Sequence, residues 1–310
     1  MDIAKATVII PAYGATPHLA RVLTALSNGA LKPDEIIVSH SGEHDPSEEI
    51  LARFPNVTVL HSDLRLFAGA ARNRGARIAK NPILAFCDSD TVPVHNWLGN
   101  GCAGLMQHEG SFIVGSVGHT LTGENSDAQN SDARNSSNGG YWGMATWISE
   151  FSEQAPWRPQ GNQTGGASCN FICLAADMQA VGYFPETLLV AEDTLLFHQL
   201  RTHGLKQVFL PQVQVNHCNI SGFAHFSRHI FGHGVAFARL RSRHRLGGSF
   251  AIKFWPLSWM LGIAKFIRIT GRIVKSGKGS IKRLAYFLPA VLIGAIIWQG
   301  GVFKALMSKD

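Results

Sequence analysis

The chain has 310 residues, of which 45% are hydrophobic, enough for one large domain or for one domain with an appendage. Its net charge of +7 is unevenly distributed, since residues 1–193 carry 11 Lys or Arg against 20 Asp or Glu, whereas residues 194–309 carry 17 Lys or Arg and no acidic residue. Because the basic clusters of this second part alternate with bulky apolar stretches, the pattern favours an anionic membrane surface as partner and argues against nucleic acid.

The first hundred residues alternate short β-rich runs with helical patterns. The expected strands are residues 7–11, 35–39, 57–60 and 82–87, and the expected helices are residues 18–26, 46–53 and 68–79. This succession predicts an α/β fold with a mainly parallel, Rossmann-like sheet flanked by helices. Ligands of such sheets bind beyond the carboxyl ends of the strands. The residues that follow Ile10, Val38 and Cys87 should therefore surround one crevice.

The middle of the chain is less regular. A strand is expected at residues 111–117. Residues 120–140 are dominated by Asn, Ser, Asp and Gly and predict a mobile loop, either a lid ordered by substrate or an inert insertion. Order resumes at residues 141–147, followed by a strand at 169–174 and a helix at 193–203.

Five cysteines lack the paired spacing of a zinc site. We expect buried, reduced thiols and a cytosolic environment. The cysteines are Cys87, Cys102, Cys169, Cys173 and Cys218.

The C-terminal part has the composition of a membrane-associating region. Residues 284–303 are uncharged and would span about 30 Å as a helix. Pro289 and Gly294 argue against a straight spanning helix and favour a broken or re-entrant element, or one lying in the membrane interface. Residues 252–273 suit an interfacial helix, the alternative being an amphipathic helix packed on the protein itself. The predicted domains are residues 1–245, catalytic, and residues 246–310, membrane-associating.

Two carboxylates directly follow the strand expected at residues 82–87. Asp88 and Asp90 can turn towards one hard cation, Mn²⁺ or Mg²⁺, which would neutralise charge on a diphosphate leaving group. The alternative is an Asx turn that closes the strand. In the preceding helix, Arg72 offers a cationic fork among small residues, or else forms an ordinary surface ion pair.

Four motifs occur in order along the chain. They are Val-Ile-Ile-Pro-Ala-Tyr at residues 8–13, a Gly- and Arg-rich run at 69–75, Phe-Cys-Asp-Ser-Asp at 86–90 and Val-Ala-Glu-Asp-Thr at 190–194. Together they resemble glycosyltransferase family 2 over residues 5–245. The resemblance implies the GT-A fold and the inverting, metal-dependent transfer of a sugar from a nucleotide diphosphate-sugar, usually a UDP-sugar. The segment from Phe226 resembles that of non-processive members acting on lipid-linked or saccharide acceptors, which favours transfer of a single sugar.

The resemblance assigns residues to the nucleotide-sugar. Pro11, Ala12 and Tyr13 would line the pocket for the nucleotide base. Arg72, Asp88 and Ser89 would lie beside the donor. His40 stands where the family usually has an acidic residue that helps to hold the nucleoside. Either His40 contacts the base or ribose differently, or Asp63 compensates.

Metal binding and catalysis are assigned in the same way. Asp88 and Asp90 would bind the metal, with His217 as a further metal or phosphate ligand unless it is a structural histidine. The catalytic pair would be Glu192 and Asp193, with Asp193 as the general base. A helix N-terminus would keep Asp193 ionised. The alternative role for Asp193 is simple helix capping.

The predicted location is the cytoplasmic face of a membrane, with the C-terminal segment peripheral or inserted. The same fold is compatible with two other functions. One is an inactive membrane scaffold that retains the nucleotide-sugar fold. The other is a nucleotidyltransferase, but the Gly-rich, Arg-containing loop typical of that chemistry does not follow the first strand.

Overall fold

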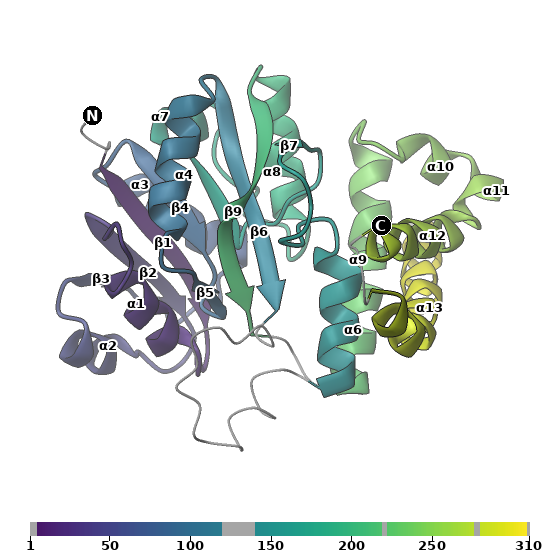
Figure 1. Cartoon of the computed structure of the whole chain (residues 1–310), viewed down its shortest axis with the longest axis horizontal. Coiled ribbons are helices and arrows are strands. Elements are labelled where there is room, and N and C mark those ends of the chain that lie inside the picture. Colours follow the sequence, from purple (N-terminus) through teal and green to yellow (C-terminus); the bar gives the residue numbers. More distant parts are fainter. Residues whose placement is uncertain (1–4, 120–139, 219–221, 276–279, 309–310) are drawn as a thin grey trace. The chain divides into compact units, whose positions relative to one another are not determined.

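The computed structural model describes residues 5–119, 140–218, 222–275 and 280–308 (Figure 1). The chain divides into two compact units. Unit 1 comprises Met1–Gly118 and Gln154–His217, and unit 2 comprises His119–Glu153 and Cys218–Asp310. The division after His217 comes earlier than the boundary expected at residue 245, because the helix that precedes residue 245 packs with the C-terminal helices. Of the loop predicted at residues 120–140, all but Gly140 lies outside the described residues.

Unit 1 is built on a mixed sheet with the strand order β3-β2-β1-β4-β8-β6-β9-β5, and β7 pairs with β9. The strands are β1 (Ala6–Tyr13), β2 (Glu35–Ser41), β3 (Val57–Leu60), β4 (Ile83–Cys87), β5 (Thr91–Pro93), β6 (Ser111–His119), β7 (Gly161–Asn162), β8 (Asn170–Leu174) and β9 (Lys206–His217). Strands β1 to β4 are parallel, as predicted, whereas the pairs β4–β8, β6–β8, β5–β9 and β7–β9 are antiparallel. The parallel pattern ends at β4, because its second neighbour in the sheet is β8, which runs antiparallel to it.

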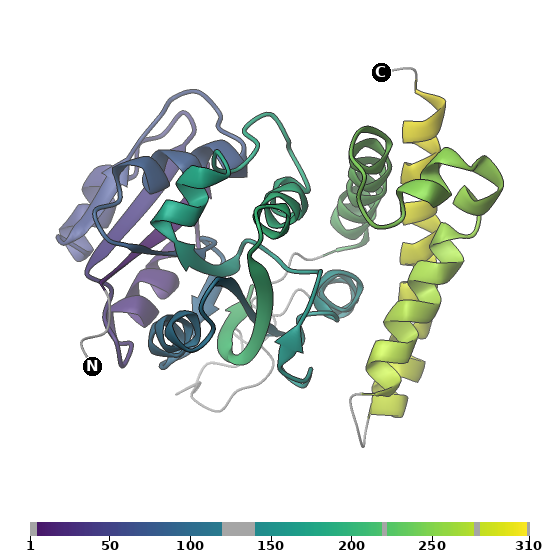
Figure 2. The ribbon, with the colours of Figure 1, turned by 90° about the horizontal axis from the view of Figure 1, so that it is seen from above.

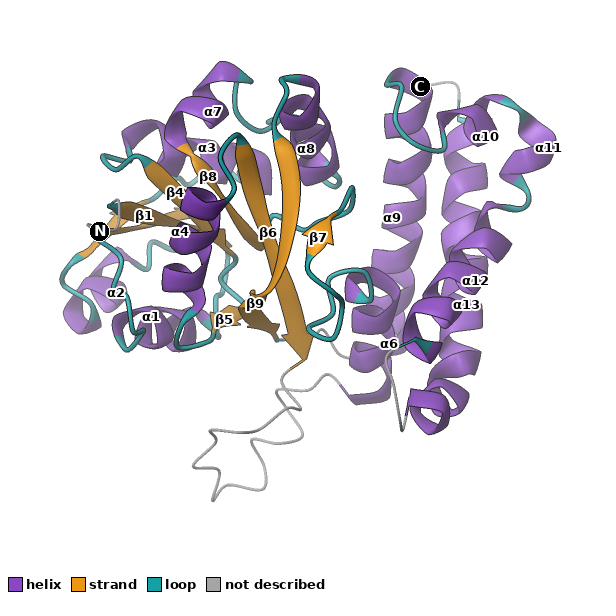
Figure 3. Cartoon of the chain, turned by 45° about the horizontal axis from the view of Figure 1, so that its top comes forward, coloured by secondary structure: helices purple, strands orange, loops and turns teal. Residues whose placement is uncertain are grey.

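Helices cover both faces of this sheet (Figure 3). The helices of unit 1 are α1 (Leu19–Ser27), α2 (Ser47–Arg53), α3 (Ala68–Ile78), α4 (Trp97–Gln107), α7 (Ala175–Ala180) and α8 (Glu192–Thr202). On one face, Phe86 and Phe171 stack with their ring centroids 5.3 Å apart and join a core that includes residues of α3, α7 and α8. Helix α4 packs on the opposite face, where a Cβ at Gly101 would collide with Ile172. Adjacent residues of a strand point to opposite faces, so Phe171 and Ile172 serve the two layers.

Unit 2 consists of helices. They are α6 (Gly140–Phe151), α9 (Phe223–Arg243), α10 (Ser249–Lys253), α11 (Trp255–Ser258), α12 (Leu261–Val274) and α13 (Ser280–Met307). Helix α13 packs along α9 and α12 (Figure 2). A Cβ at Gly234 of α9 would collide with the carbonyl oxygen of Trp298, and one at Gly301 of α13 with that of Phe231. Small residues at these points let the two backbones approach closely.

Of the alternatives for the C-terminal element, a broken helix is contradicted by the structure. Helix α13 continues through Pro289, and its glycines serve helix packing instead of interrupting the helix. By length and composition, Ala285–Met307 could cross a membrane, and 44% of its most apolar window is buried inside the structure. All five cysteines are buried thiols, as expected.

Candidate functional site

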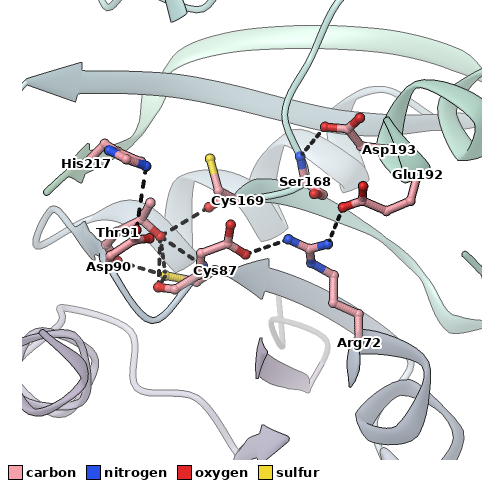
Figure 4. A network of polar contacts seen from close by, with 10 residues as sticks. Arg72, Cys87, Asp90, Thr91, Ser168, Cys169, Glu192, Asp193 and His217 are labelled. Atoms are coloured by element: carbon pink, nitrogen blue, oxygen red, sulfur yellow. Dashed lines mark hydrogen bonds and ion pairs between the residues drawn. The ribbon is translucent and has the colours of Figure 1, made fainter. Parts of the chain in front are cut away.

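The turn that follows β4 carries Asp88 and Asp90, the two aspartates singled out in the sequence. Asp90 is labelled in Figure 4, beside Thr91 and His217. Thr91 closes this turn, because Asp88 N donates to Thr91 Oγ1 at 2.8 Å and Thr91 N donates to Asp88 O at 3.1 Å. Thr91 is fully buried and also contacts Cys87, whose thiol pKa is raised by burial. A neutral thiol and a threonine therefore fix the base of the turn, while Asp88 and Asp90 project from it.

Arg72 links this turn to a helix more than a hundred residues away in sequence. Its Nη2 donates to Asp88 Oδ1 at 2.6 Å and its Nη1 donates to Glu192 Oε1 at 2.8 Å. The Arg72 side chain is only 3% exposed, which excludes the surface ion pair considered as an alternative. Although burial opposes its charge, Asp88 and Glu192 raise the pKa of Arg72. A permanently charged guanidinium thus holds the turn and the start of α8 together.

Asp193 lies in the first turn of α8, next to Glu192. Its Oδ1 accepts a hydrogen bond from Thr194 N at 2.6 Å, and its Oδ2 accepts one from Ser168 N at 3.4 Å. Burial, followed by the adjacent Glu192, raises the pKa of Asp193 to about 7. Lost hydration and the like charge of Glu192 therefore act against the expected effect of the helix N-terminus, which favours the ionised form of Asp193.

Asp193 is not the N-cap residue of α8. The N-cap of α8 is Ala191, which adopts the left-handed conformation with φ of 69°. A non-glycine residue rarely adopts this conformation, and such strain is typical of functional sites. Asp193 is thus a residue of the helix itself and not the N-cap.

His217 is brought to the aspartates by strand pairing. The antiparallel register sets His217 of β9 opposite Thr91 of β5. The Nε2 atom of His217 lies 3.8 Å from Asp90 Oδ2. The Asp90 side chain remains 40% exposed, yet surrounding protein atoms raise its pKa, an effect that His217 opposes and Asp88 reinforces. The structure thus brings His217 beside Asp90, while Asp88 pairs with Arg72 and Ser89 is half-buried between the aspartates.

The end of β1 carries the residues expected to line a base pocket. Pro11 and Ala12 are buried, while Tyr13 is 53% exposed. The guanidinium of Arg65 lies over the Tyr13 ring, 4.6 Å from its centroid. Sequence reasoning missed Arg65, which belongs to no motif, and Thr91, whose position directly after Asp90 was a usable signal.

His40 lies at the end of β2 with both ring nitrogens engaged. Its Nε2 lies 2.9 Å from the carbonyl oxygen of Gly14, and its Nδ1 lies 3.0 Å from Nδ1 of His61. The His61 Nε2 atom in turn lies 3.1 Å from Asp63 Oδ1. Because His40 is only 1% exposed, its ring offers no nitrogen to a ligand in this arrangement. Of the two alternatives for this position, the geometry favours Asp63.

Sequence comparisons place this arrangement among sugar transferases. The model described as "Glycosyl transferase family 2" matches residues 7–176. The chain is 24% identical over 213 residues to the pre-mycofactocin glycosyltransferase of Mycobacterium tuberculosis, covering 68% of this chain and 42% of that protein. It is 28% identical over 129 residues to glycosyltransferase AglE of Haloferax volcanii, covering 40% of this chain and 42% of that protein. The matched part is thus less than half of these relatives.

Solved structures confirm the fold class. A mannosyltransferase from Pyrobaculum calidifontis, in complex with GDP-Man and Mn²⁺, has a TM-score of 0.64 at 14% identity, covering 99% of this chain and 88% of that chain. S. aureus TarS has a TM-score of 0.54 at 14% identity, covering 96% and 92% of the two chains. The mixed sheet flanked by helices is therefore the predicted GT-A fold.

Proposed function

Since the chain belongs to glycosyl transferase family 2, we propose that it is an inverting, metal-dependent transferase that moves one sugar from a nucleotide diphosphate-sugar to a lipid-linked or saccharide acceptor at a membrane. The observation that carries the proposal is the bridge made by Arg72 between Asp88 and Glu192. This bridge connects the turn after β4, which would face the diphosphate, to the start of α8, where Asp193 would act as the base.

In the proposed reaction, Asp193 takes the proton of the acceptor hydroxyl while the hydroxyl oxygen attacks the anomeric carbon. The bond from that carbon to the diphosphate breaks, and the diphosphate leaves with the bonding electron pair. A pKa of about 7 suits this role, because the carboxylate is available at neutral pH yet basic enough to accept a proton. Glu192, expected at the catalytic centre, acts in this proposal through Arg72 by positioning the start of α8.

Asp88, Asp90 and His217 would hold the divalent cation, Mn²⁺ or Mg²⁺. The residues fit such an ion, because the two aspartates offer the carboxylate oxygens that Mn²⁺ and Mg²⁺ prefer, and the 40% exposed Asp90 carboxylate lies 3.8 Å from the imidazole of His217. When bound, the metal would neutralise negative charge on the departing diphosphate. The guanidinium of Arg72 places a fixed positive charge next to Asp88. Ser89 would lie beside the donor.

The exposed pair of Tyr13 and Arg65 supports a base-binding role for the end of β1, where Pro11 and Ala12 form the buried floor. A planar aromatic ring backed by a guanidinium is a suitable stacking surface for a nucleobase. We expect a UDP-sugar as donor, with Asp63 in place of His40 as the acidic group near the nucleoside.

Association with an anionic membrane is supported by unit 2. Its exposed apolar side chains include Phe250, Phe254, Trp259, Met260, Ile263, Ile267, Tyr286 and Ile296. Exposed Lys253 and Arg268 lie among them in α10 and α12. Apolar side chains that enter the headgroup region and cations that face anionic lipid are the signature of an interfacial helix. The cytoplasmic face of the membrane is the proposed location.

The test uses the purified full chain with UDP-, GDP- and dTDP-sugars, with and without Mn²⁺. Donor binding is measured by calorimetry, and nucleotide release is measured with lipid-linked acceptors. We expect Asp193→Asn to bind the donor but to lose turnover by about 10²- to 10⁴-fold. Asp90→Asn should lose the metal-dependent part of donor binding.

Asp177→Asn, an aspartate on α7 outside the site, is the matched control and should leave both measurements unchanged. Unchanged turnover in either Asp193→Asn or Asp90→Asn would remove the assigned role. Folded protein that binds no donor across the panel would instead support the inactive scaffold.

A further inference from the structure

A second group of potential metal ligands lies in unit 2, where no residue of the proposed catalytic site occurs. Glu150 is near the end of α6, and His229 and His233 are one turn apart on α9. The Nε2 atom of His229 lies 2.7 Å from Glu150 Oε1, and that of His233 lies 3.3 Å from the same oxygen. One ligand atom from each residue falls within 4.8 Å of the other two.

These separations match the coordination sphere of a small transition metal. A tetrahedral ion with bonds of about 2.1 Å holds its ligand atoms ~3.4 Å apart. The two observed distances, 2.7 and 3.3 Å, lie at or below that value, so small outward side-chain rotations would place an ion among the three atoms. Histidines at i and i+4 lie on the same face of a helix, which is a common way to supply two imidazole ligands.

Glu150 has an unusual environment for a carboxylate. Its Oε1 atom is buried, and the imidazole nitrogens of His229 and His233 both face this one oxygen. Two imidazole nitrogens and a carboxylate oxygen that converge in this way can share a cation. The side chains of His229 and His233 are between one third and two fifths exposed, which leaves an entry path.

The surroundings of Glu150 differ from those of the other acidic residue that the structure describes in unit 2. Glu153 forms an ion pair with Arg272 at 2.8 Å, an ordinary compensation for a strongly basic unit. Glu150 instead faces imidazole nitrogens. The half-buried Lys265, whose ammonium donates to Ser149 O at 3.4 Å, also favours the charged form of Glu150 and can support that charge when no metal is bound.

We propose that Glu150, His229 and His233 form a site for a Zn²⁺-class transition metal, distinct from the Mn²⁺ or Mg²⁺ site proposed in unit 1. Two imidazoles and one carboxylate suit zinc and its neighbours, whereas Mg²⁺ prefers an all-oxygen shell. Three protein ligands leave a fourth position for water. The ion would clamp the end of α6 to the middle of α9, the helix on which α13 packs. The assignment does not depend on the proposed transferase activity.

The test uses tag-free, full-length protein stripped with a chelator and then loaded with Zn²⁺ or Co²⁺. Zinc retained after desalting is measured by elemental analysis, and Co²⁺ is followed by its visible absorption in a low-symmetry site. We expect about one tightly held Zn²⁺ per chain, with an affinity at least about tenfold weaker in His233→Ala and in Glu150→Gln, since even outer-shell changes cost ~10- to 100-fold. Glu150→Gln keeps the side-chain shape, so it reports on ligation if His233→Ala folds poorly.

Two matched variants separate this site from the rest of the chain. His244→Ala, at the end of α9 but outside the cluster, and Asp90→Asn, in the unit 1 site, should both retain the Zn²⁺. Zinc bound equally by the wild type and by Glu150→Gln and His233→Ala would overturn the proposal. A wild type that retains no zinc after desalting would also overturn it. The latter outcome would identify the cluster as a metal-free group of Glu150, its two histidines and Lys265.

Discussion

The raised pKa of Asp193 makes the pH dependence of the reaction a direct test of its role as base. Burial and the charge of Glu192 raise this pKa to about 7. Because a base acts only when deprotonated, kcat/KM should fall as the pH drops below 7. At pH 6 roughly one tenth of the carboxyl groups are ionised, so kcat/KM should be about tenfold below its plateau.

Glu192→Gln tests the cause of the shift. Removing the second contributor should move the acidic limb of the pH profile to lower pH, while burial keeps it above the ordinary range of an aspartate. The glutamine can still accept a hydrogen bond from Arg72, which preserves the frame of the site. Initial rates of nucleotide release at low donor concentration, from pH 5.5 to 8.5, give the profile.

Glu186→Gln is the control, because Glu186 is half-exposed and pairs with Arg77 away from Asp193. Its acidic limb should coincide with that of the wild type. A flat profile from pH 5.5 to 8 would refute the assignment of Asp193 as base, and a limb that stays in place in Glu192→Gln would refute the electrostatic origin of the shift.

The raised pKa of Asp193 also predicts that stability and activity change in opposite directions as the pH rises. The folded carboxyl group binds its proton more tightly than the unfolded chain, so the free energy of unfolding of unit 1 should fall as the pH rises from about 4 to about 7. Asp193→Asn removes the charge and should be more stable than the wild type at pH 8, by at most on the order of 4 kcal/mol. Thermal midpoints at pH 8 check this. An inactive variant that melts below the wild type would mean that the activity was lost through the fold.

Three further substitutions test packing and association. Arg72→Ala leaves two carboxylates without their shared cation and should destabilise unit 1 by about 3–5 kcal/mol, read from hydrogen exchange in α3 and α8; exchange unchanged there would contradict the bridge. Gly301→Ala forces a methyl group against a carbonyl oxygen of α9 and should lower the free energy of unfolding by about 1–3 kcal/mol in denaturant titrations. Gly300→Ala, where the added methyl group meets only ordinary contact distances, should be near neutral. Equal losses in the two variants would argue against the close helix contact. Ile267→Asp, at an exposed position of α12, should weaken binding to anionic vesicles by about tenfold. Ile78→Asp, at an exposed position of unit 1, should leave vesicle binding unchanged. Equal effects would exclude α12 from the membrane face.

Local sequence patterns predicted the elements that form early in the chain but not those that depend on tertiary contacts. Strands β1 to β4 are short apolar runs between turn residues, and each was located within a few residues. Helix α4 was missed because Gly99, Gly101 and Gly104 lower its helix propensity. Two of these glycines are required by close packing against Ile172 and Leu210, a constraint that appears only in three dimensions.

Pro289 shows the opposite error. A proline inside an apolar stretch predicted a break in the C-terminal element, because proline removes one hydrogen bond of the helix. The helix survives because its packing against α9 and α12 outweighs a loss of this size. Sequence periodicity carries no information about such partners.

The candidate site was predictable to the extent that its residues follow strand ends or open helices. Asp88, Asp90 and Asp193 were found in this way. The bridge from Arg72 to Glu192 joins residues 120 positions apart, and the raised pKa of Asp193 depends on burial that the sequence does not display. The cluster in unit 2 was missed for the same reason, since Glu150 and the α9 histidines are distant in sequence.

The exchange of an acidic residue for His40 changes the physical character of the position. The contacts with Gly14 O, between the two Nδ1 atoms and with Asp63 engage all four ring nitrogens of His40 and His61. Because its ring nitrogens are occupied and its side chain is buried, His40 cannot replace the hydrogen-bond acceptor that an acidic residue offers to a nucleoside. The carboxylate of Asp63, whose side chain is 88% exposed, can offer that acceptor.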